Sequence, residues 1–144
     1  MVRLAKRIEQ LELNMARPKE EQPTDGELEV LKVLWDRGPS TVREVLDVLT
    51  AARPRAYTSV MSLLNVMTEK GLVARQAKGR AFVYRAKSDR ARTLRSMVGR
   101  LVGRAFEGST SQLVAHLLDQ TKPSDQELEE IRQAIKDYQQ QRAK

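Results

Sequence analysis

Hydrophobic residues recur every three to four positions along most of the chain, a spacing that predicts a mainly α-helical protein. The central stretch, residues 53–84, begins with one such helix, whose apolar face is formed by Val60, Leu63, Leu64 and Met67. Gly71 follows as a helix stop, because glycine adopts the left-handed conformation at little cost. Two short runs, 72–75 and 81–84, then flank a basic turn that contains glycine, which predicts a β-hairpin.

Two more helices are predicted before this stretch, each opened by a capping box in which threonine precedes glutamate by three residues. The boxes are Thr24/Glu27 and Thr41/Glu44, and each is followed by a single apolar stripe. Three helices joined by short turns and followed by a hairpin predict a winged helix-turn-helix domain over residues 24–87.

Residues 88–144 carry three further amphipathic helices, a unit too small to bury its apolar faces alone. Packing against a second copy solves this problem, so the predicted fold class is mainly α, with an N-terminal winged helix-turn-helix (three helices plus a β-hairpin wing) and a C-terminal α-helical dimerisation domain. The residues predicted to form the dimer interface are Leu94, Met97, Val98, Leu101, Phe106, Leu113, Leu117, Leu128, Ile131 and Ile135.

Residues 1–23 precede the predicted domains as an N-terminal arm. Leu4, Ile8, Leu11 and Met15 have the spacing of an amphipathic helix. Pro18 and the charged run after it are also typical of a linker, so the sequence leaves a helix and a mobile arm as alternatives.

The distribution of charge indicates which class of molecule the protein binds. The 144-residue chain has a formal net charge of +7, and residues 51–86 alone contain seven basic residues and one acid, a local net charge of +6. Such clustering favours a polyanionic partner. The chain has no cysteine, which excludes disulfides and thiolate metal sites, and no long apolar run, so we expect a cytoplasmic protein without membrane insertion.

The front of the third helix and the hairpin carry the side chains best suited to DNA. Short polar groups on a helix hydrogen-bond base edges and phosphates, whereas basic residues on a hairpin clamp the backbone. A solvated polar face and a solvated hairpin tip are the alternatives. Met61 and Val66 would either touch thymine methyl groups or close the edge of the core. The predicted DNA-binding residues are Arg55, Tyr57, Thr58, Ser59, Ser62, Asn65, Arg75, Lys78 and Arg80.

The sequence contains no group of residues that predicts a catalytic site. His116 is the only histidine, and it lies in an apolar stretch without a cysteine, a second histidine or an acid at metal-ligand spacing. There is no glycine-rich phosphate loop. We therefore expect no enzyme activity, no cofactor and no metal site.

Six segments, in this order and spacing, resemble the penicillinase and methicillin-resistance repressors (the BlaI/MecI type, with the copper-responsive CopY branch). They are Glu27–Trp35, Thr41–Val45, Ala56–Leu64, Lys70–Val73, Phe106–Ser109 and Ser124–Arg132. The resemblance implies an N-terminal winged helix, a helical dimerisation domain and repression by a homodimer bound to inverted-repeat, double-stranded operator DNA.

In several members of that family a membrane sensor protease relieves repression by cutting the C-terminal domain. The aligned segment here is Val114–Leu118, which places a cleavage site at His116-Leu117, where other members have pairs such as Asn-Phe. The copper branch uses a C-terminal cysteine cluster that this chain lacks. Two alternatives to a repressor are a winged-helix module that binds protein without specific DNA binding, and a basic nucleoid protein that binds any duplex.

Overall fold

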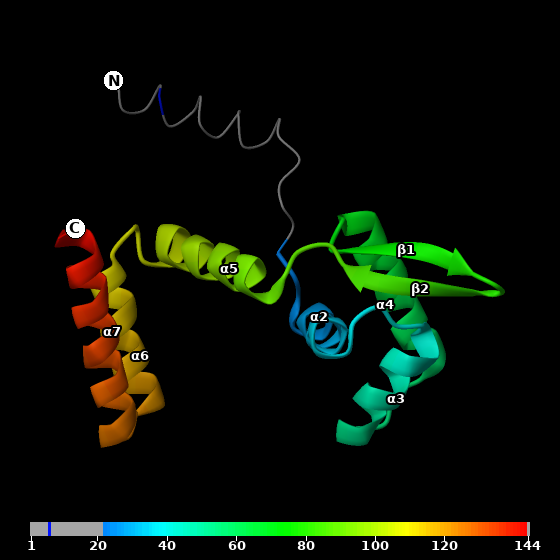
Figure 1. The fold of residues 1–144 in the computed structure, drawn as a ribbon, viewed down its shortest axis with the longest axis horizontal. Helices are drawn as coiled ribbons and strands as arrows, with labels where there is room; N and C mark the ends of the chain where they lie inside the picture. Colours follow the sequence, from blue (N-terminus) through cyan, green and yellow to red (C-terminus); the bar gives the residue numbers. More distant parts are fainter. Residues whose placement is uncertain (1–5, 7–21, 144) are drawn as a thin grey trace. The chain divides into compact units, whose positions relative to one another are not determined.

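The computed structural model describes residue 6 and residues 22–143 of the chain (Figure 1). Most of the predicted arm over residues 1–23 therefore lies outside the described residues. The elements follow the predicted order, and the mainly helical fold class with a two-stranded hairpin is confirmed. They are α2 (Asp25–Arg37), α3 (Val42–Ala52), α4 (Tyr57–Lys70), β1 (Val73–Lys78), β2 (Ala81–Ala86), α5 (Arg90–Ala105), α6 (Thr110–Thr121) and α7 (Asp125–Ala143).

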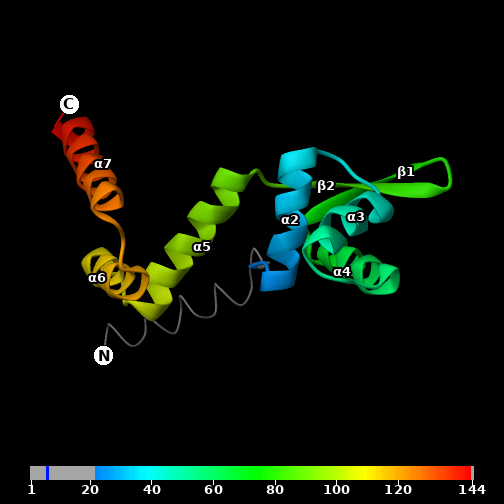
Figure 2. The same ribbon diagram turned by 90° about the horizontal axis from the view of Figure 1, so that it is seen from below.

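Helices α2, α3 and α4 share one hydrophobic core with the base of the hairpin (Figure 2). Each helix contributes the apolar stripe that its sequence spacing predicts. The tip of the hairpin projects beyond the three helices, as a wing does. The buried hydrophobic residues are Val30, Leu31, Val33, Leu34, Val42, Val45, Leu46, Leu49, Val60, Leu64, Met67, Val73 and Tyr84.

Both predicted capping boxes at the starts of α2 and α3 are present. The Thr24 hydroxyl accepts from the Glu27 N–H at 3.3 Å, and the Glu27 carboxylate accepts from the Thr24 N–H at 2.9 Å. The corresponding Thr41–Glu44 distances are 3.2 and 3.1 Å. These bonds satisfy amides that a helix start otherwise leaves without a partner, so the sequence fixes where α2 and α3 begin.

The hairpin is longer than the sequence pattern predicted. Strand pairing continues to Lys78↔Ala81, which leaves a turn of only two residues, Gly79 and Arg80. The predicted five-residue connection was wrong because residues 76–78 are polar or small and lack the apolar alternation of a half-buried strand. Their backbone groups nevertheless pair, since a projecting strand is stabilised by its ladder. Gly79 has a φ of 64°, which glycine adopts without strain.

A buried ion pair joins the first turn of α2 to the last residue of α4. The Lys70 Nζ lies 2.6 Å from the Glu27 Oε1, and the Glu27 side chain is only 2% exposed. Burial alone raises the pKa of Glu27, but hydrogen bonds from Lys70 and Thr24 outweigh it, so this pKa lies below its ordinary value of 4.5. Glu27 therefore closes a capping box and holds the end of α4 with one carboxylate.

The chain divides into two units, Met1–Arg95 and Ser96–Lys144, with the division inside α5. The boundary predicted from the sequence lies slightly earlier, between residues 87 and 88. The first unit holds the connection that leads into α5, because the Trp35 indole N–H donates to the Ser88 carbonyl at 2.9 Å and the Arg90 guanidinium lies 5.8 Å from the Trp35 ring. Trp35 thus packs against the core and anchors the exit of the chain from the winged helix.

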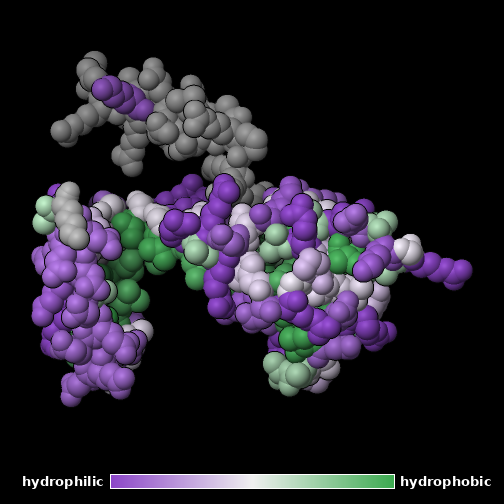
Figure 3. Space-filling view, viewed as in Figure 1, coloured by the Kyte–Doolittle hydropathy of each residue, from purple (hydrophilic) through white to green (hydrophobic). Residues whose placement is uncertain are grey.

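The C-terminal helices bury none of their residues. No residue of α5, α6 or α7, all of which are described, is buried. Figure 3 shows hydrophobic residues in green gathered at the surface of the C-terminal unit, beside the hydrophilic surface of α7. Of the predicted interface residues, Val98 is 53% exposed and Ile135 is 52% exposed. An isolated chain would therefore leave a large apolar area in contact with water.

We expect Glu27→Gln to lower the free energy of unfolding by about 1–3 kcal/mol at pH 7, because it removes the carboxylate from the partly buried Lys70 ammonium. A lowered carboxyl pKa stabilises the fold above about pH 4.5 and ceases to do so as the pH falls through the folded-state value. The stability difference between wild type and variant should thus shrink below pH 4.5 in urea titrations.

The matched control is Glu44→Gln. Glu44 also closes a capping box and pairs with an arginine, but its side chain is 40% exposed, so the loss should be smaller. Equal losses for the two variants would contradict a special role for the buried pair.

Candidate nucleic-acid interface

A groove of about 430 Å³ lies between the start of α3, the outer face of α4 and the wing. Its floor is apolar and includes Met61 and Phe82, which are 37% and 44% exposed. The wing side of the groove carries Arg75 and Arg80. A basic-sided groove with a hydrophobic floor suits a sugar–phosphate strand, because the phosphates meet cations and the deoxyribose meets carbon.

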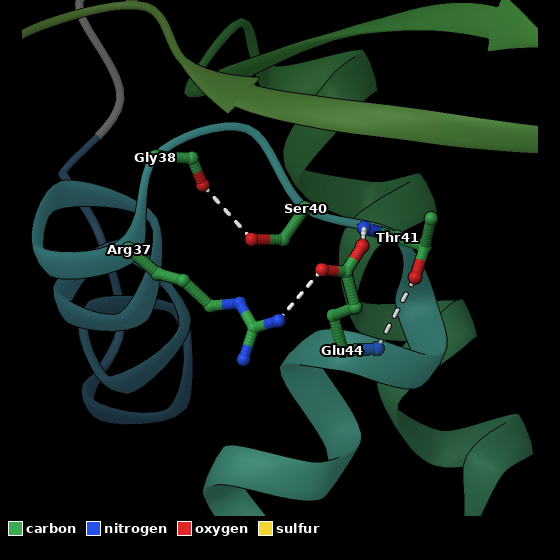
Figure 4. Close-up of polar contacts among 5 residues, drawn as sticks. All are labelled: Arg37, Gly38, Ser40, Thr41 and Glu44. Atoms are coloured by element: carbon green, nitrogen blue, oxygen red, sulfur yellow. Dashed lines mark hydrogen bonds and ion pairs between the residues drawn. The ribbon is translucent and has the colours of Figure 1, made fainter.

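Hydrogen bonds and an ion pair hold the connection between α2 and α3 (Figure 4). This connection leads into the first turn of α3, which lines the groove. Ser40 is fully buried, exchanges two backbone hydrogen bonds with Tyr84 at 2.8 and 2.9 Å, and donates its hydroxyl to the Gly38 carbonyl at 2.9 Å. Arg37 pairs with Glu44 at 2.7 Å. The Thr41 and Arg37 hydrogen bonds lower the pKa of Glu44, which stays charged and keeps the cap closed.

Two arginines stack on aromatic rings beside the groove. The Arg43 guanidinium lies 5.2 Å from the centre of the Tyr57 ring, and the Arg75 guanidinium lies 4.4 Å from that of Phe82. Stacking limits the conformations of an arginine while leaving its N–H donors available. The structure thus holds one oriented cation on each side of the groove.

Arg43 and Phe82 were missed by the sequence analysis as interface residues. No sequence signal marks Arg43 as an interface residue, because a basic residue in the first turn of a helix is usually a solvated surface residue. Phe82 had a usable signal, because it lies two residues before the buried Tyr84 and therefore on the same face of β2. That face belongs to the core at the base of the wing and to the groove near its tip.

The structure brings four of the nine predicted contact residues together in this groove. Tyr57, Asn65, Arg75 and Arg80 line the groove. Thr58, Ser59 and Ser62 are exposed on α4. Lys78 ends β1 at the wing tip, on the opposite strand face from Arg75. Their individual contacts with DNA stay predictions.

The start of α4 differs from the starts of α2 and α3. Its N-cap residue is Ala56, and no side chain caps it. The backbone N–H groups of the first turn therefore remain available to an acceptor outside the helix. Such amides bind phosphate when they meet one, aided by the helix dipole.

Arg55 is placed differently from the other predicted contacts. Its guanidinium forms an ion pair with Glu29 of α2, and its side chain is only 11% exposed. Arg53 approaches the other oxygen of the same carboxylate at 3.6 Å. The structure thus gives Arg55 a partner inside the protein, and direct contact with DNA stays a prediction for this residue.

Residues 22–143 contain no candidate metal site and no candidate membrane span. No three histidine, cysteine, aspartate or glutamate side chains there converge as metal ligands would. None of the helices in this part of the chain has both the length and the apolar character needed to cross a bilayer.

Comparison with known proteins agrees with this geometry. The penicillinase repressor family profile matches residues 23–137. The penicillinase repressor of Bacillus licheniformis is 25% identical over 117 residues, covering 81% of this chain and 91% of that protein. The transcriptional regulator BlaI of Mycobacterium tuberculosis is 44% identical over 62 residues, 41% of this chain and 45% of that protein.

A solved structure is also similar to about half of the chain. It is the solution structure of Bacillus licheniformis BlaI, in its monomeric form, in complex with the blaP half-operator. It is 30% identical and covers 51% of this chain and 89% of the solved chain, with a TM-score of 0.45.

We expect Arg80→Ala and Asn65→Ala to have opposite signatures in DNA binding. Arg80→Ala should weaken binding to all sequences about equally and lower the slope of log affinity against log salt by about 1, as loss of one phosphate contact does. Asn65→Ala should change base preference at one position, at a cost of about 1–3 kcal/mol for the preferred base. Fluorescence anisotropy on a panel of single-base variants across a salt series measures both.

These two variants serve as controls for each other. A change of base preference in Arg80→Ala would place the wing in contact with base edges. A uniform loss in Asn65→Ala would remove α4 from direct readout at that position.

Proposed function

The chain belongs to the penicillinase repressor family and is a DNA-binding transcriptional repressor, not an enzyme; from this premise we propose that it represses by binding inverted-repeat operators as a homodimer. The observation that carries the proposal is the C-terminal unit, whose helices display apolar stripes and bury no residue. Because the chain belongs to a repressor family, we do not propose the two alternative functions, a protein-binding module and a nucleoid protein.

We propose that α4 is the recognition helix and lies in the major groove. Its exposed Thr58, Ser62 and Asn65 have the donors and acceptors that base edges require. The groove between α4 and the wing would then hold one sugar–phosphate strand. Arg43 and Arg75, oriented by their stacked rings, would flank this strand and fix the position of the helix along the duplex.

Dimerisation follows from the energetics of the exposed stripes. Burying apolar surface stabilises by about 25 cal/mol per Å², so covering the half-exposed leucine and valine side chains favours association. Leu101 and Leu117 are 46% and 49% exposed, and Tyr138 is 64% exposed. A two-fold dimer would present two copies of α4 about 34 Å apart, or a multiple of this distance, which matches a palindromic operator.

The proposal extends to how DNA is released. Because sensor proteases cut repressors that this chain resembles, we propose the His116-Leu117 bond as the point where cleavage would end repression. The bond lies in α6, a helix of twelve residues with none buried. Leu117 also belongs to the proposed dimer interface, so a cut there would separate α7 from the winged helix and disrupt the dimer.

We expect Leu101→Asp to convert the dimer into a monomer, because it places a charge in the apolar stripe of α5. Size-exclusion chromatography with light scattering should give half the wild-type mass, and affinity for a palindromic duplex should fall toward that for a half-site. Arg92→Gln is the control, since it lowers net charge by the same amount and Arg92, nine residues before Leu101, lies on the opposite face of α5. A monomeric wild type at micromolar concentration would refute the homodimer.

For the release step, we expect limited proteolysis with a protease of broad specificity to cut the monomeric Leu101→Asp variant within residues 114–118 before it cuts α2, α3 or α4. A short helix without buried residues unfolds locally at little cost. Mass spectrometry identifies the first bond cut. Early cleavage within the winged helix, with α6 intact, would contradict this proposal.

A further inference from the structure

Glu29 occupies a central position among the charges around α4. One of its carboxylate oxygens pairs with the Arg55 guanidinium, and the other faces Arg53 at 3.6 Å. Arg53 and Arg55 flank Pro54 in the connection between α3 and α4. A single acid on α2 thus engages two of the basic residues that precede the recognition helix.

We call the contacts of Glu29 with Arg53 and Arg55 the Glu29 clamp. The clamp requires a negative charge on Glu29, and this residue stays charged at neutral pH. The hydrogen bond from Arg55 lowers the pKa of its carboxyl below the ordinary value, with a smaller contribution from Arg53. The two arginines differ in burial, because the Arg55 side chain is 11% exposed and that of Arg53 is 66% exposed. Glu29 therefore holds Arg55 firmly and Arg53 loosely.

The clamp lies where α4 has least support of its own. Ala56 provides no side-chain cap, so the hydrogen bonds that fix the starts of α2 and α3 have no counterpart at the start of α4. The other end of α4 is tied to α2 through Lys70 and Glu27. Two glutamates of α2, Glu27 and Glu29, therefore hold the end of α4 and the segment before its start.

We propose that Glu29 is a specificity-determining residue: it positions the start of α4 for base contacts and keeps Arg53 and Arg55 from binding phosphate at arbitrary sequences. This inference rests on the proposed function of α4 as the recognition helix. Phosphate contacts add affinity without sequence information, and a recognition helix whose start can shift loses base contacts. Releasing the clamp therefore raises affinity for random DNA and lowers affinity for the operator.

The test compares full-length Glu29→Gln with wild type on two duplexes of equal length. One is selected from a random pool by the wild-type protein, and the other has random sequence. We expect the ratio of the two affinities to fall about tenfold or more, as it does when one or two base contacts are lost. The salt slope on the random duplex should steepen by about 1–2, one for each freed arginine.

Asp36→Asn is the matched control. It removes one negative charge from the same helix at an exposed position where the structure shows no ion pair, so it changes net charge equally. An affinity ratio and salt slope for Glu29→Gln that equal those of Asp36→Asn would overturn the inference. A wild type that selects no sequence from the pool would instead refute the proposed function.

Arg55→Gln provides an independent test if Glu29→Gln folds poorly. An arginine held by Glu29 makes no phosphate contact, so Arg55→Gln should leave the salt slope on random DNA unchanged. A slope lower by about 1 would show that Arg55 binds phosphate directly and would overturn the inference. Thermal unfolding of each variant confirms that the comparison is made between folded proteins.

Discussion

The attachment of α4 to α2 through charged side chains is the interaction on which the rest of the N-terminal unit depends. The hydrophobic core fixes which face of α4 is buried, but the hydrophobic effect itself is non-directional. The Glu27–Lys70 pair is directional and largely withdrawn from water, so it fixes the position of α4 along the helix axis. Groups on the outer face of α4 take their positions from this constraint together with the packing of the core.

The two units differ in how they bury their apolar residues, although both have helices with apolar stripes. The winged helix closes its core within one chain, because three helices and a hairpin enclose a common interior. The C-terminal helices have stripes of similar composition but no described residue is buried among them. Small units hide too little surface to be stable alone, and the exposed stripes therefore support the proposed dimer.

Local signals in the sequence were sufficient for much of this fold. Capping boxes, the glycine after Lys70 and the spacing of Val60, Leu64 and Met67 act over a few residues, and each appears in the structure as predicted. Sequence periodicity does not predict two other contacts, because they join residues far apart in sequence. These are the ion pair of Arg55 with Glu29 and the stacking of Arg43 on Tyr57. The extra length of the strands was missed for a related reason, since backbone pairing at the wing tip needs no apolar pattern.

The two-residue turn at Gly79 has a consequence for how the wing of such a protein can change in length. Successive side chains of a strand point to opposite sides, so one extra residue in each strand would keep the pairing at the base of the wing but would turn the residues at its tip to the other side. Lengthening therefore has to come in paired steps, two residues in each strand. The length of the wing would therefore change in steps of roughly 7 Å, which is the rise of two residues in an extended strand.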